Sequence, residues 1–128
     1  DGDVQGVMMT SQKDIDVDIY FGTGGAPEGV LAAAALQCIG GQIQTRLVIR
    51  NDDEKQRAEK LGIKDLDKKY MIDDLATGDI VFVATGVTEG TMVKGVKKLG
   101  SLYTTHSIVL RSDEHTTQYI QTQYPNIS

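Results

Sequence analysis

The sequence lacks three features that mark particular classes of protein. It has a single cysteine, Cys38, which excludes an intrachain disulfide and favours a reducing compartment. It shows no secretory signal pattern and no apolar run long enough to span a bilayer, so we expect a cytoplasmic protein. It has no excess of basic residues, because its net charge is -5 at pH 7. We therefore expect neither nucleic acid nor membrane among its partners.

The chain does contain the residues of an ordinary globular protein. Its 128 residues are 40% hydrophobic and 24% charged, which is enough for one domain with a buried core. Because it has no repeat, long linker or low-complexity segment, residues 1–128 are interpreted as a single domain. The chain opens on Asp1-Gly2-Asp3 without a methionine, and we expect it to be a piece of a longer protein.

The first third of the chain predicts a strand–helix–strand unit. Residues 14–21 alternate polar and apolar side chains, as a half-buried strand does. Residues 27–39 carry apolar side chains four apart, and Gly40-Gly41 would end that helix. Residues 43–49 read as a second strand, parallel to the first with a right-handed connection. The predicted buried face of the helix consists of Val30, Leu31, Ala34, Ala35 and Cys38.

The rest of the chain continues the alternation of elements, which predicts a layered α/β domain. Asn51-Asp52 can cap a polar helix that runs to about Lys60 and ends at Leu61-Gly62. Residues 65–75 are ambiguous. The other predicted elements are strands at 79–83, 103–111 and about 116–124, and a short helix at 92–99.

A glycine-rich loop precedes the first predicted helix, with the sequence FGTGGAPEG from Phe21 to Gly29. Gly24 and Gly25 would let a ligand approach the main chain, and Pro27 suits the first turn of a helix. No Ser, Thr, Asp or Asn stands just before Pro27, so the first N–H groups of the helix lack an obvious cap and would attract an anion. Glu28 in that turn either pairs with the helix dipole or binds a metal ion beside the anion. A tight connection without any ligand is the simpler alternative.

Three familiar motifs do not fit the sequence. A dinucleotide fingerprint counted from Gly22 needs its third glycine where Pro27 stands. A P-loop counted from Gly24 needs Lys and Ser or Thr where Val30 and Leu31 stand. An EF-hand counted from Asp1 has Gln12 at its twelfth position instead of glutamate.

The remaining polar groups favour structural interpretations when they are read alone. Asp1 and Asp3 could accept hydrogen bonds from sugar hydroxyls or bind a hard metal ion, but an isolated Asp-Gly-Asp is more often a solvated turn. A second loop, ATGVTEG at 84–90, is interpreted as the end of a strand. Cys38 is interpreted as a core residue. His106, His115 and the lysines at 94–98 are interpreted as strand or surface residues.

Taken in order, the DGDV opening, the GTGGAPEGV loop and ATGVTEG resemble the C-terminal portion of class II fructose-1,6-bisphosphatases, which include relatives that act on sedoheptulose-1,7-bisphosphate. The resemblance covers nearly the whole chain. It implies a layered α/β sandwich of the sugar-phosphatase and inositol-phosphatase superfamily. It also implies hydrolysis of the 1-phosphate of fructose-1,6-bisphosphate to fructose-6-phosphate in gluconeogenesis, with Mn²⁺ or Mg²⁺ as cofactor.

The resemblance also implies roles for individual residues. Glu28 matches the metal-binding glutamate of the family, and Gly25, with Gly24 beside it, matches a backbone contact to substrate. Asp1, Gly2 and Asp3 match its substrate-binding Asp-Gly-Asp. The other metal carboxylates of the family lie upstream of this motif, so no catalytic residue is assigned here and we expect the chain alone to be inactive. The resemblance implies a homodimer or homotetramer. The alternatives are an inactive phospho-ligand binding or regulatory module and a purely structural α/β domain.

Overall fold

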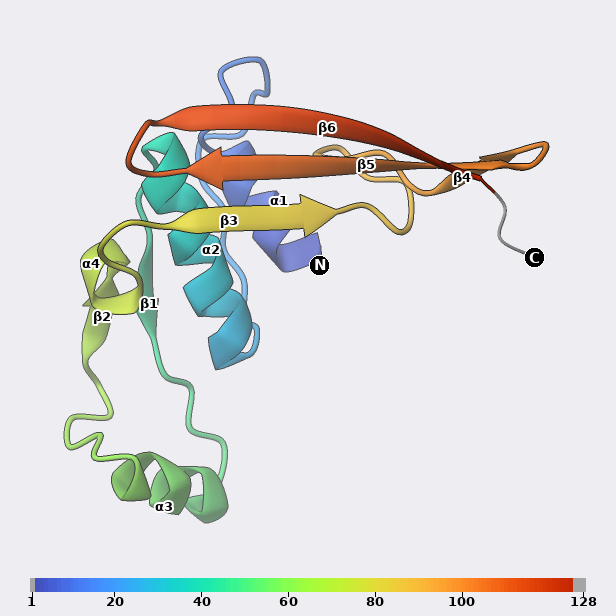
Figure 1. Cartoon of the computed structure of the whole chain (residues 1–128). Coiled ribbons are helices and arrows are strands. Elements are labelled where there is room, and N and C mark those ends of the chain that lie inside the picture. Colours follow the sequence, from blue (N-terminus) through green and yellow to red (C-terminus); the bar gives the residue numbers. More distant parts are fainter. Residues whose placement is uncertain (1, 126–128) are drawn as a thin grey trace.

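The computed structural model describes residues 2–125 and has an α/β architecture (Figure 1). Asp1 and residues 126–128 lie outside the described part of the chain. Along the sequence the elements are α1 (Gly2–Met9), α2 (Ala26–Ile39), β1 (Gln44–Arg46), α3 (Asp52–Lys60), β2 (Lys69–Met71), α4 (Ile72–Leu75), β3 (Val81–Thr85), β4 (Lys97–Leu99), β5 (Leu102–Arg111) and β6 (Thr116–Pro125).

The main sheet is antiparallel and is built around β5. Strand β6 pairs with β5 along its whole length, from Leu102 opposite Pro125 to Arg111 opposite Thr116. The other edge of β5 pairs with β3 and then with β4, so that Val83 lies opposite Val109. Helices α1 and α2 lie on one face of this sheet (Figure 1). The hairpin and its partner β3 confirm the strands predicted near 79–83, 103–111 and 116–124.

Helix α2 forms largely as its sequence predicts. Pro27 stands in its first turn, and Gly40 ends it in the left-handed conformation with φ 85°, where its N–H donates to the Leu36 carbonyl at 2.8 Å. The buried face differs from the predicted one, because Val30 and Leu31 remain exposed at the start of the helix, before it passes under the sheet. The buried residues are Ala32, Ala33, Ala35, Leu36 and Cys38.

The hydrophobic core lies where α1 and α2 meet the sheet. Its principal cluster joins Val4 and Met8 of α1 to Phe82, Ile108 and Leu110 of the sheet, with Ala35 and Cys38 of α2 between them. The alanines let the helix approach the strands closely, and this contact sets the position of α2. Cys38 is a buried core residue as predicted, and burial raises the pKa of its thiol.

The segment 14–21 is not a strand, so the predicted parallel strand–helix–strand unit is wrong. Its backbone closes local turns instead, since Ile15 N–H donates to Gln12 and Val17 N–H donates to Ile15. It pairs with none of the described strands, and Ile19 and Phe21 are exposed. Alternation predicts which side chains share a face, but a strand also needs a neighbour for its hydrogen bonds. The strand predicted at 43–49 is reduced to β1, which pairs antiparallel with β2.

Helix α3 stands apart from the rest of the molecule on the β1–β2 ribbon (Figure 1). The Asn51 side chain accepts from Glu54 N–H at 2.9 Å, and Glu54 accepts from Arg50 N–H at 2.8 Å. This reciprocal cap confirms the helix predicted from Asn51-Asp52 to Lys60. The short helix predicted at 92–99 is wrong, because Lys97–Leu99 pairs with β5 as strand β4. Among the described helices, none is long and apolar enough to cross a membrane.

Candidate functional site

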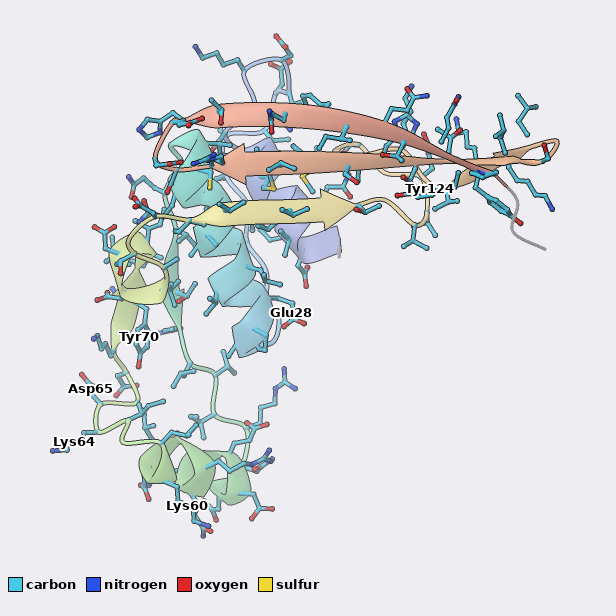
Figure 2. The ribbon with its side chains drawn as sticks, viewed as in Figure 1. Glu28, Lys60, Lys64, Asp65, Tyr70 and Tyr124 are labelled. Carbon is cyan, nitrogen blue, oxygen red and sulfur yellow. The ribbon has the colours of Figure 1, made fainter. Side chains whose placement is uncertain are left out.

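The glycine loop Phe21–Gly29 leads into α2 at the end of the molecule where α1 also begins. The two helices pack against each other and run in the same general direction (Figure 1). Their N-termini therefore face the same side, and the positive ends of two helix dipoles point toward it. Asp3 stands in the first turn of α1. Glu28 stands in the first turn of α2 (Figure 2).

Asp3 and Glu28 both lie against the backbone of Gly24 and Gly25. A Cβ placed on Gly24 would stand 3.2 Å from Asp3 Oδ2 and 4.0 Å from the Cβ of Glu28. Glu28 is partly buried, and its Oε2 folds back so closely over Gly25 that a side chain there would collide with it. The structure thus brings together Asp3, Gly24, Gly25 and Glu28. Gly2 begins α1 beside them, whereas Asp1 lies outside the described residues.

The start of α2 keeps the open amides that the sequence predicts. Gly25 is the N-cap residue, with φ -69° and ψ 156°, and no side chain caps the helix. The Gly24 and Gly25 N–H groups donate to no other described residue. Uncapped N–H groups with a helix dipole behind them attract an anion. A glutamate in the same turn would repel that anion unless a cation lay between them.

The carboxylates fit a divalent metal ion in kind but not in number. Asp3 and Glu28 offer oxygen donors, which Mg²⁺ and Mn²⁺ prefer. A site for such an ion needs more protein ligands or bound waters than these residues supply. Within residues 2–125, no group of three or more His, Cys, Asp or Glu side chains is placed to hold a metal ion. Glu28 can therefore contribute one ligand to a site that other residues would have to complete.

Tyr20 is the residue of this region that sequence reasoning missed. Its Oη donates to Asp3 Oδ1 at 2.7 Å, which links α1 to the segment leading into the glycine loop. This hydrogen bond, with a smaller contribution from burial and the Asp3 charge, raises the pKa of the Tyr20 phenol. Gly6 and Gly22 both lie against the Tyr20 ring, but the sequence does not show that contact.

The second loop, 84–90, packs against the backbone that follows it, at Lys94 and Gly95. Gly86 lies so close to the Lys94 carbonyl that a Cβ would clash with it, and a Cβ on Gly95 would stand 2.7 Å from Glu89 N. Glu89 accepts from Gly95 N–H at 3.0 Å, which holds the two sides of the loop together. Gln5 of α1 contacts Thr91 at the tip. Thr85 is the last residue of β3, so the interpretation of ATGVTEG as a strand end is confirmed.

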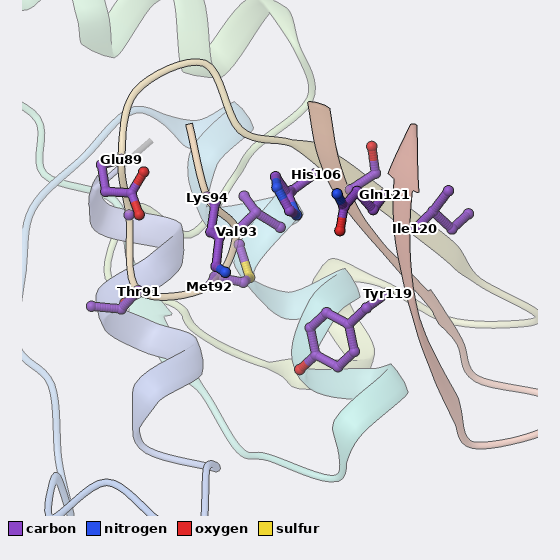
Figure 3. A pocket seen from close by; sticks show the side chains of 11 residues that line it. Glu89, Thr91, Met92, Val93, Lys94, His106, Tyr119, Ile120 and Gln121 are labelled. Atoms are coloured by element: carbon purple, nitrogen blue, oxygen red, sulfur yellow. The ribbon is translucent and has the colours of Figure 1, made fainter. Parts of the chain in front are cut away.

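An open hollow of about 510 Å³ lies between this second loop and the sheet (Figure 3). His106 and Gln121 face each other across β5 and β6, and Lys94 and Tyr119 line the same hollow. The residues of the glycine loop are not part of its lining. His106 is accordingly a strand residue as predicted, and the hollow is separate from the paired carboxylates.

Comparison with known proteins relates this geometry to a family. Residues 1–124 match the model of a family described as bacterial fructose-1,6-bisphosphatase, glpX-encoded. The chain is 39% identical to the fructose-1,6-bisphosphatase class 2 of Haemophilus influenzae and 33% identical to fructose-1,6-bisphosphatase 1 class 2 of Escherichia coli K12. Each similarity covers 94% of this chain but 40% of the relative. The chain therefore spans about two fifths of the length of these curated relatives.

Proposed function

Since the chain belongs to the family of bacterial, glpX-encoded fructose-1,6-bisphosphatases, we propose that it is the C-terminal part of a metal-dependent phosphatase. The enzyme hydrolyses the 1-phosphate of fructose-1,6-bisphosphate and releases fructose-6-phosphate and phosphate. It works in gluconeogenesis in the cytoplasm. Residues 1–128 form a domain that supplies part of the active site, and residues upstream of them complete it.

One observation carries this proposal. Asp3 and Glu28, two carboxylates from separate helices, lie beside Gly24 and Gly25 at a pair of helix N-termini. Open amides and helix dipoles favour a phosphate there, and the carboxylates favour a cation. A phosphate ester bound together with a divalent metal ion satisfies both preferences.

The proposal assigns a role to each of these residues. Glu28 holds a Mg²⁺ or Mn²⁺ ion, which when bound supplies Lewis-acid stabilisation of the charge on the phosphoryl group. The Gly24-Gly25 backbone approaches the phosphate closely, because neither residue has a side chain to block it. Asp1, Gly2 and Asp3 bind the sugar, and Asp3 accepts hydrogen bonds from its hydroxyls.

A homodimer or homotetramer belongs to the same proposal. The face of the sheet opposite α1 and α2 carries Val81 and Val83, which are 61% and 59% exposed. Uncharged β-branched side chains of this kind are usually covered in an assembled protein. Upstream residues of the enzyme or a second subunit would provide that cover.

The test is Glu28→Gln in the full-length enzyme. Glutamine keeps the size of the side chain but removes the charge that binds the metal ion, so we expect kcat to fall about 100-fold or more. The Mn²⁺ concentration needed for half-maximal activity should rise, and the thermal midpoint should stay unchanged. The matched control is Glu59→Gln on the remote helix α3, which should leave all three values as they are. Unchanged kinetics in Glu28→Gln would remove this residue from the site and overturn the proposal.

A further inference from the structure

The hydrogen bond from Tyr20 to Asp3 orients a carboxylate that the proposed function places against the sugar. Asp3 has two oxygens with different surroundings. Oδ1 accepts from the Tyr20 hydroxyl at 2.7 Å, whereas Oδ2 stands on the Gly24 side, 3.2 Å from where a Cβ of that glycine would be. A bond to a charged acceptor is among the stronger and more directional hydrogen bonds. Holding Oδ1 therefore limits rotation of the carboxylate and keeps Oδ2 directed toward the glycine loop.

The Tyr20 ring is itself held by two glycines from different segments. A Cβ on Gly6 of α1 would stand 2.7 Å from Cε2 of the ring, and a Cβ on Gly22 would stand 2.8 Å from Cε1. Real Cβ atoms do not approach an aromatic carbon so closely, so any larger residue at either position would displace the ring. The ring lies between these two backbones, and its hydroxyl reaches Asp3 because both positions are glycine. This explains Gly6 and Gly22, which the proposed function does not assign to the phosphate.

The contact also joins two parts of the chain that the site requires together. Tyr20 and Asp3 are 17 residues apart, and the backbone runs from Tyr20 directly into the loop that contains Gly24 and Gly25. Residues 10–19, between α1 and Tyr20, form no strand or helix, so the Tyr20 contact helps to fix the loop against α1. A rigid supporting contact of this kind determines how accurately the residues that bind substrate are placed.

We propose that Tyr20 is a positioning residue that sets the orientation of Asp3 for recognition of the sugar hydroxyls. The proposal rests on the proposed function, because it needs Asp3 to face the sugar of the substrate. Tyr20 itself touches neither the phosphate nor the metal ion. It acts on the sugar-recognising part of the site and leaves the hydrolysis of the phosphate ester itself unaltered.

The experiment compares two substrates in the full-length enzyme with Mn²⁺ present. Fructose-1,6-bisphosphate has the sugar that Asp3 recognises, whereas p-nitrophenyl phosphate has a phosphate ester without sugar hydroxyls. Tyr20→Phe removes only the hydroxyl, and we expect it to raise the KM for fructose-1,6-bisphosphate about 3- to 10-fold, the range of one hydrogen bond. The kcat for that substrate and both constants for p-nitrophenyl phosphate should change less than about twofold.

Two further variants separate positioning from general stability. Tyr70→Phe on β2 removes a tyrosine hydroxyl far from the site and is the matched control, with no expected change for either substrate. Tyr20→Phe added to Asp3→Asn should cause no further loss, because the effect of Tyr20 passes through Asp3. Gly22→Ala keeps the hydroxyl but displaces the ring, and it should reproduce the rise in KM even if Tyr20→Phe folds poorly.

The outcomes distinguish this inference from the proposed function. An inactive wild-type enzyme would overturn the proposed function, and this inference with it. An active wild type whose KM for the bisphosphate is unaffected by Tyr20→Phe would overturn only the inference. Equal losses on both substrates, or full additivity with Asp3→Asn, would also overturn it, because they would mean that Tyr20 supports the fold in general.

Discussion

The two loops that combine glycine, threonine and glutamate have different structures. Each contains one glutamate, Glu28 in the first loop and Glu89 in the second. In the first loop, the space above Gly24 and Gly25 is filled by carboxylates, and the amides have no partner among the described residues. At the second loop, the space beside Gly86 is filled by the backbone of Lys94, and the space beside Gly95 is filled by the backbone of residues 87–89.

This difference shows that a glycine can serve two distinct purposes. Glu89 is occupied by the Gly95 amide and closes its loop, whereas Glu28 lies over Gly25 beside Asp3. Glycine in the second loop allows the chain to pack against itself, and glycine in the first leaves room at a helix N-terminus. Composition cannot distinguish the two, but the atoms that a Cβ would meet can.

The largest expected effect is the absence of activity in the 128-residue chain alone. It tests whether Glu89 of the second loop can supply a metal ligand that the first loop lacks. We expect the 128-residue chain alone, with Mn²⁺ or Mg²⁺, to show no turnover of fructose-1,6-bisphosphate above background. Glu28 and Asp3 do not complete a metal site, and Glu89 is already engaged in its own loop. Phosphate release is the measurement, and the same chain carrying Glu28→Gln is the control for contaminating host phosphatase. Turnover that disappears in this control would contradict the expectation.

A pair of alanine substitutions in the full-length enzyme separates the two loops directly. In Gly86→Ala the new methyl group meets the Lys94 backbone carbonyl, which cannot move without moving the loop, so we expect a loss of about 1–3 kcal/mol in the free energy of unfolding. In Gly25→Ala it meets the end of the Glu28 side chain, which can rotate away. We expect this variant to keep its stability within about 1 kcal/mol but to lose activity about tenfold or more.

Denaturant unfolding measures the stability of both variants, and steady-state kinetics measures their activity. The comparison of the loops fails if Gly25→Ala is the less stable variant, or if Gly86→Ala loses activity while its stability is unchanged. The parent enzyme, assayed in parallel, is the reference for both measurements.

The smallest expected effect concerns pH. The pKa of Tyr20 is raised in the folded state by its bond to Asp3, so folding favours the protonated phenol. The resulting stabilisation is fully present below the unfolded pKa of about 10 and is lost as pH rises through the higher folded value. The tyrosinate absorbance of the wild type should include a late-titrating contribution from Tyr20. That contribution should be absent in Tyr20→Phe and shifted to lower pH in Asp3→Asn. A titration curve that is the same in all three proteins would contradict this assignment.

The sequence predicts those parts of the fold that local chemistry controls. Helix α2 has Pro27 at its start and Gly40 at its end, and α3 has the Asn51 cap, so the boundaries of both helices were accessible. The strands near 103–111 and 116–124 were predicted, and both are long and contain several β-branched residues. Their pairing as a hairpin was not predicted. The superfamily to which the fold belongs stays a prediction.

Other elements depend on partners that the sequence does not reveal. Residues 14–21 have the alternation of a strand but no described neighbour to pair with, and residues 97–99 became a strand because β5 extends beyond β3 and offers them an edge. Residues 43–49 were expected to pair in parallel with 14–21, because one helix lies between the two segments. Strand β1 instead pairs antiparallel with β2. In each case a contact distant in the sequence decided the outcome.

The residues of the candidate site could be predicted from the sequence, but the Tyr20 contact that holds Asp3 could not. Motif order and helix chemistry singled out Asp3, Gly24, Gly25 and Glu28, and the structure places these four together. Their roles stay predictions. The Tyr20 contact was invisible because it joins positions 17 residues apart through an unpaired segment. A glycine whose only evident function is to leave room for a distant ring has no local signature.

The buried thiol of Cys38 can report local opening of the domain. Its sulfur is almost fully covered and lies 3.8 Å from the Ile80 carbonyl, where α2 meets the chain entering β3. A thiol reagent can reach it only when that contact opens, so its rate of modification follows the opening of the helix from the sheet. A cysteine introduced on exposed α3 would react far sooner. It could therefore be labelled selectively while Cys38 stays unmodified.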